Sequence, residues 1–207
     1  MPPKPKFSKE EVVTAALEIV SEKGIEALTA REVGERLGSS PRPIFTVFKN
    51  MEELSYEVKA AAMKRFEEYI GEANGYKPYL KKIGMQMIRF ACEEPKLFQL
   101  LFMSENKTAT CFDDVVNLLG VAADMCLELI HKRFGLDEKD TRNFFEQLWI
   151  FTYGISSLCA VGMCKFSEEE LSRIMGVQYA AMAALEDEGR LNEPITVPKK
   201  NVDKSLV

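Results

Sequence analysis

Hydrophobic residues recur every three or four positions along most of the chain, which is the spacing of amphipathic helices. The first predicted helix begins after Ser8, which forms a capping-box pattern with Glu11, and it ends at Gly24. Val13 and Leu17 lie about one turn apart and are expected on its apolar face. Alternation of apolar and polar residues, which would predict strands, is almost absent. The pattern therefore favours an all-α fold.

The beginning of a second, shorter helix is signalled twice. Thr29 can cap it, and Glu32 three residues later completes a capping box. Leu28 and Val33 hold the two positions of a hydrophobic staple. Gly38 is the residue best able to take the left-handed conformation that ends a helix, so the sequence predicts a helix between Thr29 and Gly38.

A tight turn and a third short helix follow. Ser39 or Ser40 can cap this helix. Its first turn contains Pro41 and Pro43, and proline is tolerated there because its missing N–H removes no intrahelical bond. Helix, glycine-containing turn and short helix make the helix-turn-helix arrangement, whose second helix can lie in a DNA major groove.

The outer face of the third helix offers groups that suit DNA. Arg42 is the clearest candidate, because a guanidinium can donate two hydrogen bonds to guanine, worth ~1–3 kcal/mol of discrimination. Pro41 and Pro43 can touch a thymine methyl and stiffen the backbone beside Arg42. The residues expected near the leading end and outer face are Ser40, Pro41, Arg42, Pro43, Phe45 and Thr46. The shared core of the three helices is expected to contain Val13, Leu17, Val20, Leu28, Val33, Leu37, Ile44 and Phe48.

Helical periodicity continues through the rest of the chain. Asn50 caps a helix that meets no breaker before Gly71. The later predicted helices span residues 77–92, 95–103, 112–134, 138–164 and 168–188. The expected organisation is a three-helix head (residues 1–50), a larger helical body (residues 51–189) and a flexible tail (residues 190–207).

Charge is divided unevenly between these parts. The formal net charge is −5, yet residues 1–50 hold eight basic against seven acidic side chains, so the remainder carries −6. Charges more than ~8 Å from a phosphate are largely screened at physiological salt, so an acidic body does not prevent DNA binding. The small positive excess of the head predicts weak nonspecific binding.

Composition excludes several other classes of protein. No apolar run approaches the ~20 residues that span a bilayer, and the first residues lack the apolar segment of a signal peptide. Five cysteines, an odd number without a Cys-x-x-Cys pair, favour the reducing cytoplasm. His131 is the only histidine and is expected on the surface. Without zinc-ligand spacing, a phosphate loop or a nucleophile elbow, we expect no enzyme, no metal and no cofactor.

The cysteines leave one alternative open. Cys159 and Cys164 lie five residues apart on a predicted helix and therefore share a face poorly, which disfavours a disulfide between them. Buried free thiols are the ordinary interpretation, and a thiol-based redox regulator is the alternative.

The last two predicted helices carry unusual surfaces. Residues 142–164 are strongly apolar, and residues 174–185 include five small side chains that permit close helix approach: Gly176, Ala180, Ala181, Ala183 and Ala184. A four-helix interface between two copies of the chain would bury both surfaces, and packing inside one chain is the alternative.

Soft and aromatic side chains are concentrated between the head and these helices. They could line a cavity for a small, largely apolar molecule, although each alone is equally expected in an ordinary core. Tyr153 or Gln147 could orient such a ligand by a hydrogen bond. The selected ligand-binding candidates are Met87, Phe90, Phe102, Met125, Trp149 and Tyr153.

The run LTAREVGERLGSSPRPIFTVFKNMEEL, residues 28–54, resembles the DNA-binding signature of TetR-type (TetR/AcrR) bacterial transcriptional repressors. The resemblance covers residues 8–54 in detail. It implies that Thr29 and Arg31 meet phosphate and base, that Arg42 and Pro43 meet bases, and that Phe45 and Lys49 lie at the backbone. The complete set of expected DNA-binding residues is Thr29, Arg31, Ser39, Ser40, Pro41, Arg42, Pro43, Phe45, Thr46 and Lys49.

Three positions depart from the family pattern. Phe45 replaces the usual tyrosine and lacks its hydroxyl, Val47 replaces a histidine, and Met51 replaces a lysine at the start of the next helix. The loss of a positive charge at Met51 can be offset by Lys49 and by the free N–H groups of the helix N-terminus. These changes predict an altered operator preference or affinity.

The resemblance implies a homodimer formed through the last two long helices on a near-palindromic double-stranded DNA operator. It also implies a small-molecule effector that releases the protein from DNA, and no membrane partner. An all-helical ligand carrier or enzyme, in which the first three helices are only a packing unit, is the competing hypothesis.

Overall fold

A computed structural model describes residues 5–73, 79–104 and 111–189, and every regular element in these ranges is helical. The helices are α1 (Lys9–Lys23), η1 (Ile25–Ala27), α2 (Ala30–Arg36), η2 (Arg42–Thr46), α3 (Met51–Gly71), α4 (Tyr79–Glu93), α5 (Pro95–Phe102), α6 (Phe112–Leu119), α7 (Val121–Phe134), α8 (Glu138–Ala160) and α9 (Glu168–Asp187). The all-α prediction is confirmed. The predicted tail, residues 190–207, lies outside the described residues.

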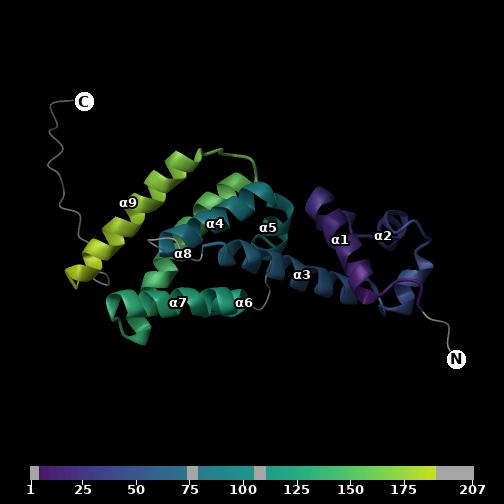
Figure 1. The fold of residues 1–207 in the computed structure, drawn as a ribbon, viewed down its shortest axis with the longest axis horizontal. Helices are drawn as coiled ribbons and strands as arrows, with labels where there is room; N and C mark the ends of the chain where they lie inside the picture. The colour runs from purple at the N-terminus through teal and green to yellow at the C-terminus, as the bar shows by residue number, and fades with distance from the viewer. Residues whose placement is uncertain (1–4, 74–78, 105–110, 190–207) are drawn as a thin grey trace.

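The molecule is elongated, with α1 and α2 at one end and α8 and α9 toward the other (Figure 1). The long helix α3 runs from the first end into the body, where it packs against α4, α5 and α7. The most extensive helix pair is α4 with α8, and α9 covers both of them. Because α3 contacts both ends, it is the continuous structural link between them.

None of the helices in the described ranges has the length and hydrophobicity that a bilayer crossing requires.

The buried face of α1 differs from the prediction. Val12 and Ile19 are fully buried, whereas Val13 and Leu17 are only partly buried. The reason is that α1 packs on α3 and α5 as well as on α2, so its innermost face turns toward the body. Its capping box at Ser8 and its end at Gly24 are confirmed.

The helix-turn-helix forms, with two local differences from the prediction. Thr29 caps α2 by accepting from the Glu32 N–H, but the Glu32 carboxylate pairs with Lys23 and does not close a capping box. This ion pair lowers the pKa of Glu32. The next helix, η2, is a single 3-10 segment that follows Pro41, and neither Ser39 nor Ser40 caps it.

Two predicted helices end at glycines with positive φ. The predicted helix 112–134 divides at Gly120, where φ is 50°, into α6 and α7. Helix α8 ends at Ala160 because Gly162, with φ 71°, turns the chain back. Both angles lie in the region where a side chain is disfavoured, so glycine permits each break.

One continuous core joins the two ends of the molecule. Its buried members extend from Val12 and Ile44 in the head to Phe144 in α8. At its centre the Phe66 ring meets the rings of Phe90 and Phe102 edge to face, with centroids 5.4 and 5.0 Å apart. Helix α3 therefore contributes to the core of the head and of the body at once.

Candidate DNA-binding surface and internal cavities

Helix η2 presents Arg42 to solvent while its other face is anchored. Ile44 and Phe48 are almost completely buried, as predicted, and they hold the segment against α1, α2 and α3. Within the described ranges, Arg42 makes no hydrogen bond or ion pair. An exposed guanidinium on an anchored backbone is available for an external partner.

The two predicted contacts on α2 are also exposed. The Thr29 hydroxyl accepts the cap hydrogen bond and still has its own proton to donate. Arg31 pairs with Glu35 one turn later, at 2.9 Å, and both side chains are mostly exposed. Pairs of this kind contribute only ~0.3–0.5 kcal/mol, so a phosphate can compete for the guanidinium.

The remaining predicted residues lie around η2. Ser39 is half-buried and its hydroxyl accepts from Lys6, whereas Ser40 and Lys49 are exposed. The Phe45 ring is 47% exposed, which is unusual for a large apolar side chain in a small head. The Thr46 hydroxyl donates to the Pro43 carbonyl at 2.6 Å, so its first role is to hold the end of η2.

The position of Met51 has a structural explanation. It is the first residue of α3, and its side chain is half-buried against the core. Asn50 caps the helix, and the Lys49 N–H donates to the Glu53 carboxylate at 2.7 Å. A phosphate near this helix start would meet the side chain of Lys49 and free backbone N–H groups, with no cation at residue 51.

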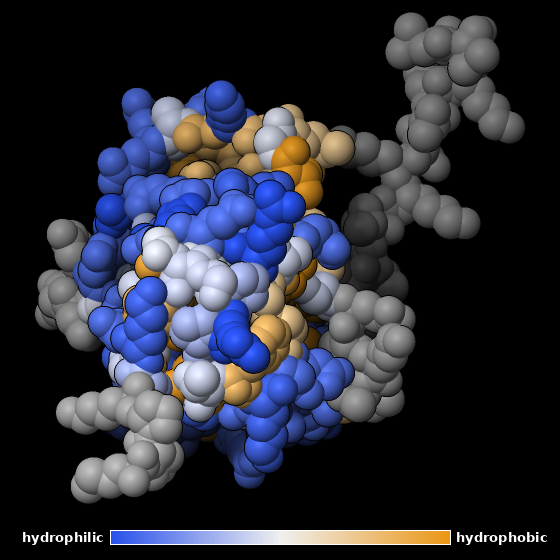
Figure 2. All heavy atoms as spheres, turned by 90° about the vertical axis from the view of Figure 1, so that its right-hand side faces the viewer, coloured by the Kyte–Doolittle hydropathy of each residue, from blue (hydrophilic) through white to orange (hydrophobic). Residues whose placement is uncertain are grey.

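Seen from the head, the surface is predominantly hydrophilic (Figure 2). Several of its cations are paired with acidic side chains: Lys9 with Glu53, and Arg36 with both Glu18 and Glu22. Arg42 and Lys49, near η2, make no such ion pair within the described ranges.

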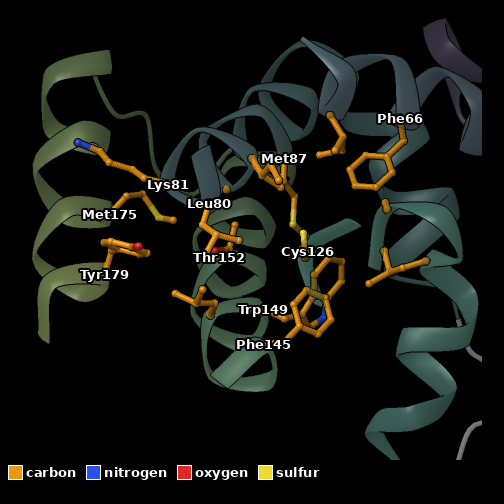
Figure 3. Close-up of a pocket in the computed structure, with 16 residues that line it drawn as sticks. Phe66, Leu80, Lys81, Met87, Cys126, Phe145, Trp149, Thr152, Met175 and Tyr179 are labelled. Carbon is orange, nitrogen blue, oxygen red and sulfur yellow. The ribbon is translucent and has the colours of Figure 1, made fainter. Parts of the chain in front are cut away.

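A small apolar cavity of about 50 Å³ lies in the body. Helices α3, α4, α6, α7, α8 and α9 supply its lining, and Met87 and Trp149 are the predicted ligand residues that border it. Met175 and Tyr179 reach it from α9 (Figure 3). Sequence reasoning missed these α9 residues, because helical spacing does not reveal which helix covers a cavity.

A second, larger cavity of about 300 Å³ lies between α3, α5, α6 and α8. Phe102 and Tyr153 line it, and Trp149 borders both cavities. The Tyr153 hydroxyl donates to the Phe102 carbonyl at 3.0 Å. Phe90 and Met125 belong to the core and line neither cavity, while Gln147 is exposed.

Polar groups are few in the smaller cavity. Among the described residues that line it, Lys81 is the only charged one, and its ammonium donates to the Ser172 hydroxyl at 2.8 Å. Thr152 and Tyr179 add hydroxyl groups. The cavity therefore suits an apolar molecule with one acceptor or anionic group at the α4–α9 side.

A buried polar contact connects the head to the body. Glu94, only 6% exposed, lies between α4 and α5. Its carboxylate pairs with Arg65 of α3 and accepts from the Ser21 hydroxyl of α1 at 2.6 Å. Three helices thus meet at one carboxylate, which the sequence pattern did not single out.

The outward faces of α8 and α9 are apolar or lined by small residues. Ile150 is 54% exposed and Val177 is 65% exposed. Gly154 lies between these exposed residues, and a side chain added there would meet open space. The small exposed residues of α9 are Ala180, Ala181 and Ala184.

Comparison with known proteins points to one family. Residues 12–58 match the family model described as bacterial regulatory proteins, tetR family. This range contains the complete helix-turn-helix and the beginning of α3. Among the curated proteins, none matches the chain.

Several solved structures share the fold over most of their length. A TetR-family transcriptional regulator from Vibrio parahaemolyticus has a TM-score of 0.62 at 15% identity, covering 83% of this chain and 96% of that one. A TetR-like regulator from a Rhodococcus species has 0.59 at 14%, covering 84% and 95%. A TetR-family regulator from Mesorhizobium loti has 0.57 at 18%, covering 86% and 95%.

These structures resemble the chain in the helical body as well as in the head. Because their sequence identities to it lie between 14% and 18%, they show a shared fold and nothing more. The match to the family model applies to the head, because it covers residues 12–58. Residues 12–58 therefore carry the sequence signature of the tetR family of bacterial regulatory proteins, and the fold of the chain is similar to that of TetR-family regulators.

Proposed function

We propose that the protein is a dimeric repressor that leaves a near-palindromic operator when a small, largely apolar molecule binds its body. The observation that carries the DNA-binding part is the exposed, unpaired Arg42 on a segment anchored by Ile44 and Phe48. We assign residues 1–50 to the DNA-binding domain and residues 51–189 to effector binding and dimerisation. Its place of action is the cytoplasm.

The proposed DNA contacts divide into two kinds. Arg42, Pro41 and Pro43 meet base edges, because they begin the helix that enters the major groove. The hydroxyl and cationic groups around them, together with the exposed ring of Phe45, meet the backbone and fix the orientation of the head. The backbone set is Thr29, Arg31, Ser39, Ser40, Phe45, Thr46 and Lys49.

The first test replaces Arg42 by alanine. We expect the affinity for a selected operator fragment to fall by ~1–3 kcal/mol, since one bidentate base contact is lost. The fold should be unchanged, because Arg42 is exposed and makes no hydrogen bond or ion pair within the described chain. Fluorescence anisotropy at one fixed, moderate salt concentration measures the effect, with Arg133→Ala on α7 as the matched control. Equal affinities for the parent and the Arg42 variant would refute the assignment.

The dimer proposal follows from the outward faces of α8 and α9. Exposed Ile150 and Val177, beside Gly154 and the small residues of α9, form a surface on which two helices from each copy can pack closely. A twofold axis through this surface would carry two heads on opposite sides, as a near-palindromic operator requires.

Replacing Gly154 by arginine should weaken the dimer at least about tenfold, since a long charged side chain would stand in the interface at a cost of more than ~1.4 kcal/mol. The single chain has room for it, and arginine favours a helix more than glycine does. Sedimentation velocity measures the change. Ala60→Arg, on an exposed face of α3, is the control. A dimer of unchanged stability would place the interface elsewhere.

The effector proposal rests on the two cavities that Trp149 separates. The smaller cavity, at about 50 Å³, has far less volume than the ~150 Å³ that holds benzene in an engineered protein core. A ligand of ordinary size therefore fits there only if α4, α8 or α9 moves. Since α4 packs on α3, that movement reaches the helix that carries the head.

Trp149, the only tryptophan, should report such binding. Decanoate and decanol share a chain length but differ in charge, so they test both the apolar cavity and the role of Lys81. We expect a saturable change in emission with both, and tighter binding of decanoate. Ala122→Leu narrows the cavity and should weaken both about tenfold, a cost of ~1.4 kcal/mol. A linear, unsaturable response would contradict an internal site.

A further inference from the structure

Three cysteines that are distant in sequence converge at the shared end of α4 and α8. Cys92 lies near the end of α4, Cys159 near the end of α8, and Cys164 in the segment after α8. The turn at Gly162 brings this segment back, so that the Cys164 N–H donates to the Leu158 carbonyl at 3.2 Å. The predicted helix 138–164 contained both Cys159 and Cys164, whereas α8 ends at Ala160 and Cys164 lies beyond it, so the cluster was not predicted.

The packing of α4 on α8 sets which thiols face each other. A Cβ built on Gly84 would lie 3.4 Å from the Thr152 hydroxyl, so these two positions are opposite one another. About one turn further along both helices, Ile88 and Ile155 pack in one cluster that Cys159 joins. The two helices therefore run in the same direction. One further turn along α4 and α8 brings Cys92 opposite Cys159.

The two thiols differ in environment. Cys92 is exposed to solvent, whereas Cys159 is half-buried. Burial, followed by the neighbouring Cys92 and Cys164, raises the pKa of the Cys159 thiol to about 12. Cys159 therefore stays protonated near neutral pH, and Cys92 is the thiol that a dissolved oxidant meets first.

We propose that Cys92 and Cys159 are an oxidisable dithiol that closes into a disulfide between α4 and α8 when a hydroperoxide reacts with Cys92. In the first step the Cys92 thiolate attacks the peroxide, forming a sulfenic acid and releasing hydroxide or alkoxide. In the second step the Cys159 sulfur displaces the sulfenic hydroxyl. Two thiols and one hydroperoxide thus give one disulfide, one water and one water or alcohol.

The other cysteines are placed differently. Cys126 is buried in α7, which raises its pKa to about 12 and shields it from oxidants. Cys111 is exposed, but its sulfur lies 3.7 Å from the Asp114 carboxylate at the start of α6. Within the described ranges no group of three or more His, Cys, Asp and Glu side chains is arranged to hold a metal ion.

The experiment treats the purified full-length chain with hydrogen peroxide, unfolds it in denaturant and then alkylates the remaining thiols with N-ethylmaleimide. Non-reducing peptide mass spectrometry should find Cys92 linked to Cys159 within one chain, with Cys111, Cys126 and Cys164 alkylated. Dithiothreitol should reverse the link. Cys92→Ser should reduce its yield at least tenfold, whereas Cys164→Ser and Cys111→Ser should leave the yield unchanged.

Circular dichroism establishes that each variant is folded, and the exposure of Cys92 makes serine there a mild change. A disulfide that instead joins Cys164 to either of the other two thiols would overturn the proposal. Oxidation that reaches Cys111 between chains before Cys92 would also overturn it. Neither result would affect the proposed DNA binding, which is measured separately with the reduced protein.

Discussion

Replacing Gly34 by valine is expected to weaken specific DNA binding about 100-fold while the helical body remains folded. A Cβ at Gly34 would lie 3.0 Å from three backbone atoms of the turn, Ser39 O, Ser40 C and Pro41 N. Backbone cannot rotate away as a flexible side chain can, so the turn must shift, and Arg42 with it. Overpacking of this kind costs ~3 kcal/mol or more, which corresponds to a loss of about 100-fold in affinity.

The measurement is anisotropy with the operator fragment, run beside circular dichroism. Gly71→Val is the matched control, because a side chain at Gly71 meets open space at the end of α3. We expect the control to bind as the parent does. Operator affinity within a factor of two of the parent for the Gly34 variant would show that the turn can yield without moving η2.

Replacing Glu94 by alanine should produce the second large effect, this time on stability. The change removes the shared partner of Ser21 and Arg65 from a site that is 6% exposed. Breaking a fully buried pair costs ~3–5 kcal/mol, but Arg65 is 42% exposed and can be hydrated, so we expect about 2–3 kcal/mol. The loss should appear in the free energy of unfolding by urea.

Glu93→Ala is the matched control for Glu94. Glu93 is the neighbouring residue and also makes an ion pair and a hydrogen bond, with Arg89 and Tyr69. Both side chains of its ion pair are almost half exposed, so its removal should cost less than ~1 kcal/mol. Equal losses in the free energy of unfolding for the two variants would mean that the buried contacts of Glu94 stabilise the fold no more than the exposed contacts of Glu93.

Local signals in the sequence were sufficient for most helix beginnings. Ser8 and Asn50 cap their helices as predicted, because a cap depends on residues only three positions apart. The failures involve competition from distant residues. The Glu32 carboxylate pairs with Lys23 and does not close the predicted capping box. No residue within one turn of Glu32 could predict this ion pair.

The candidate sites follow the same division. The burial of Ile44 and the exposure of Arg42 follow from helical spacing within η2, so sequence reasoning placed them correctly. The lining of a cavity by Met175, and the approach of Cys92 to Cys159, depend on which helices are neighbours. Spacing along one helix carries no information about the register of another.

The continuous core through α3 restricts how the head, residues 1–50, could be exchanged between related proteins. Val12 and Ile19 of α1 are covered partly by α3 and α5, which lie outside residues 1–50. A chimera joined at residue 50 would place a foreign surface against this face and would also lose the Ser21 contact to Glu94. A working graft must therefore carry the facing residues of α3 and α5 with the head, so the unit of exchange is larger than the helix-turn-helix.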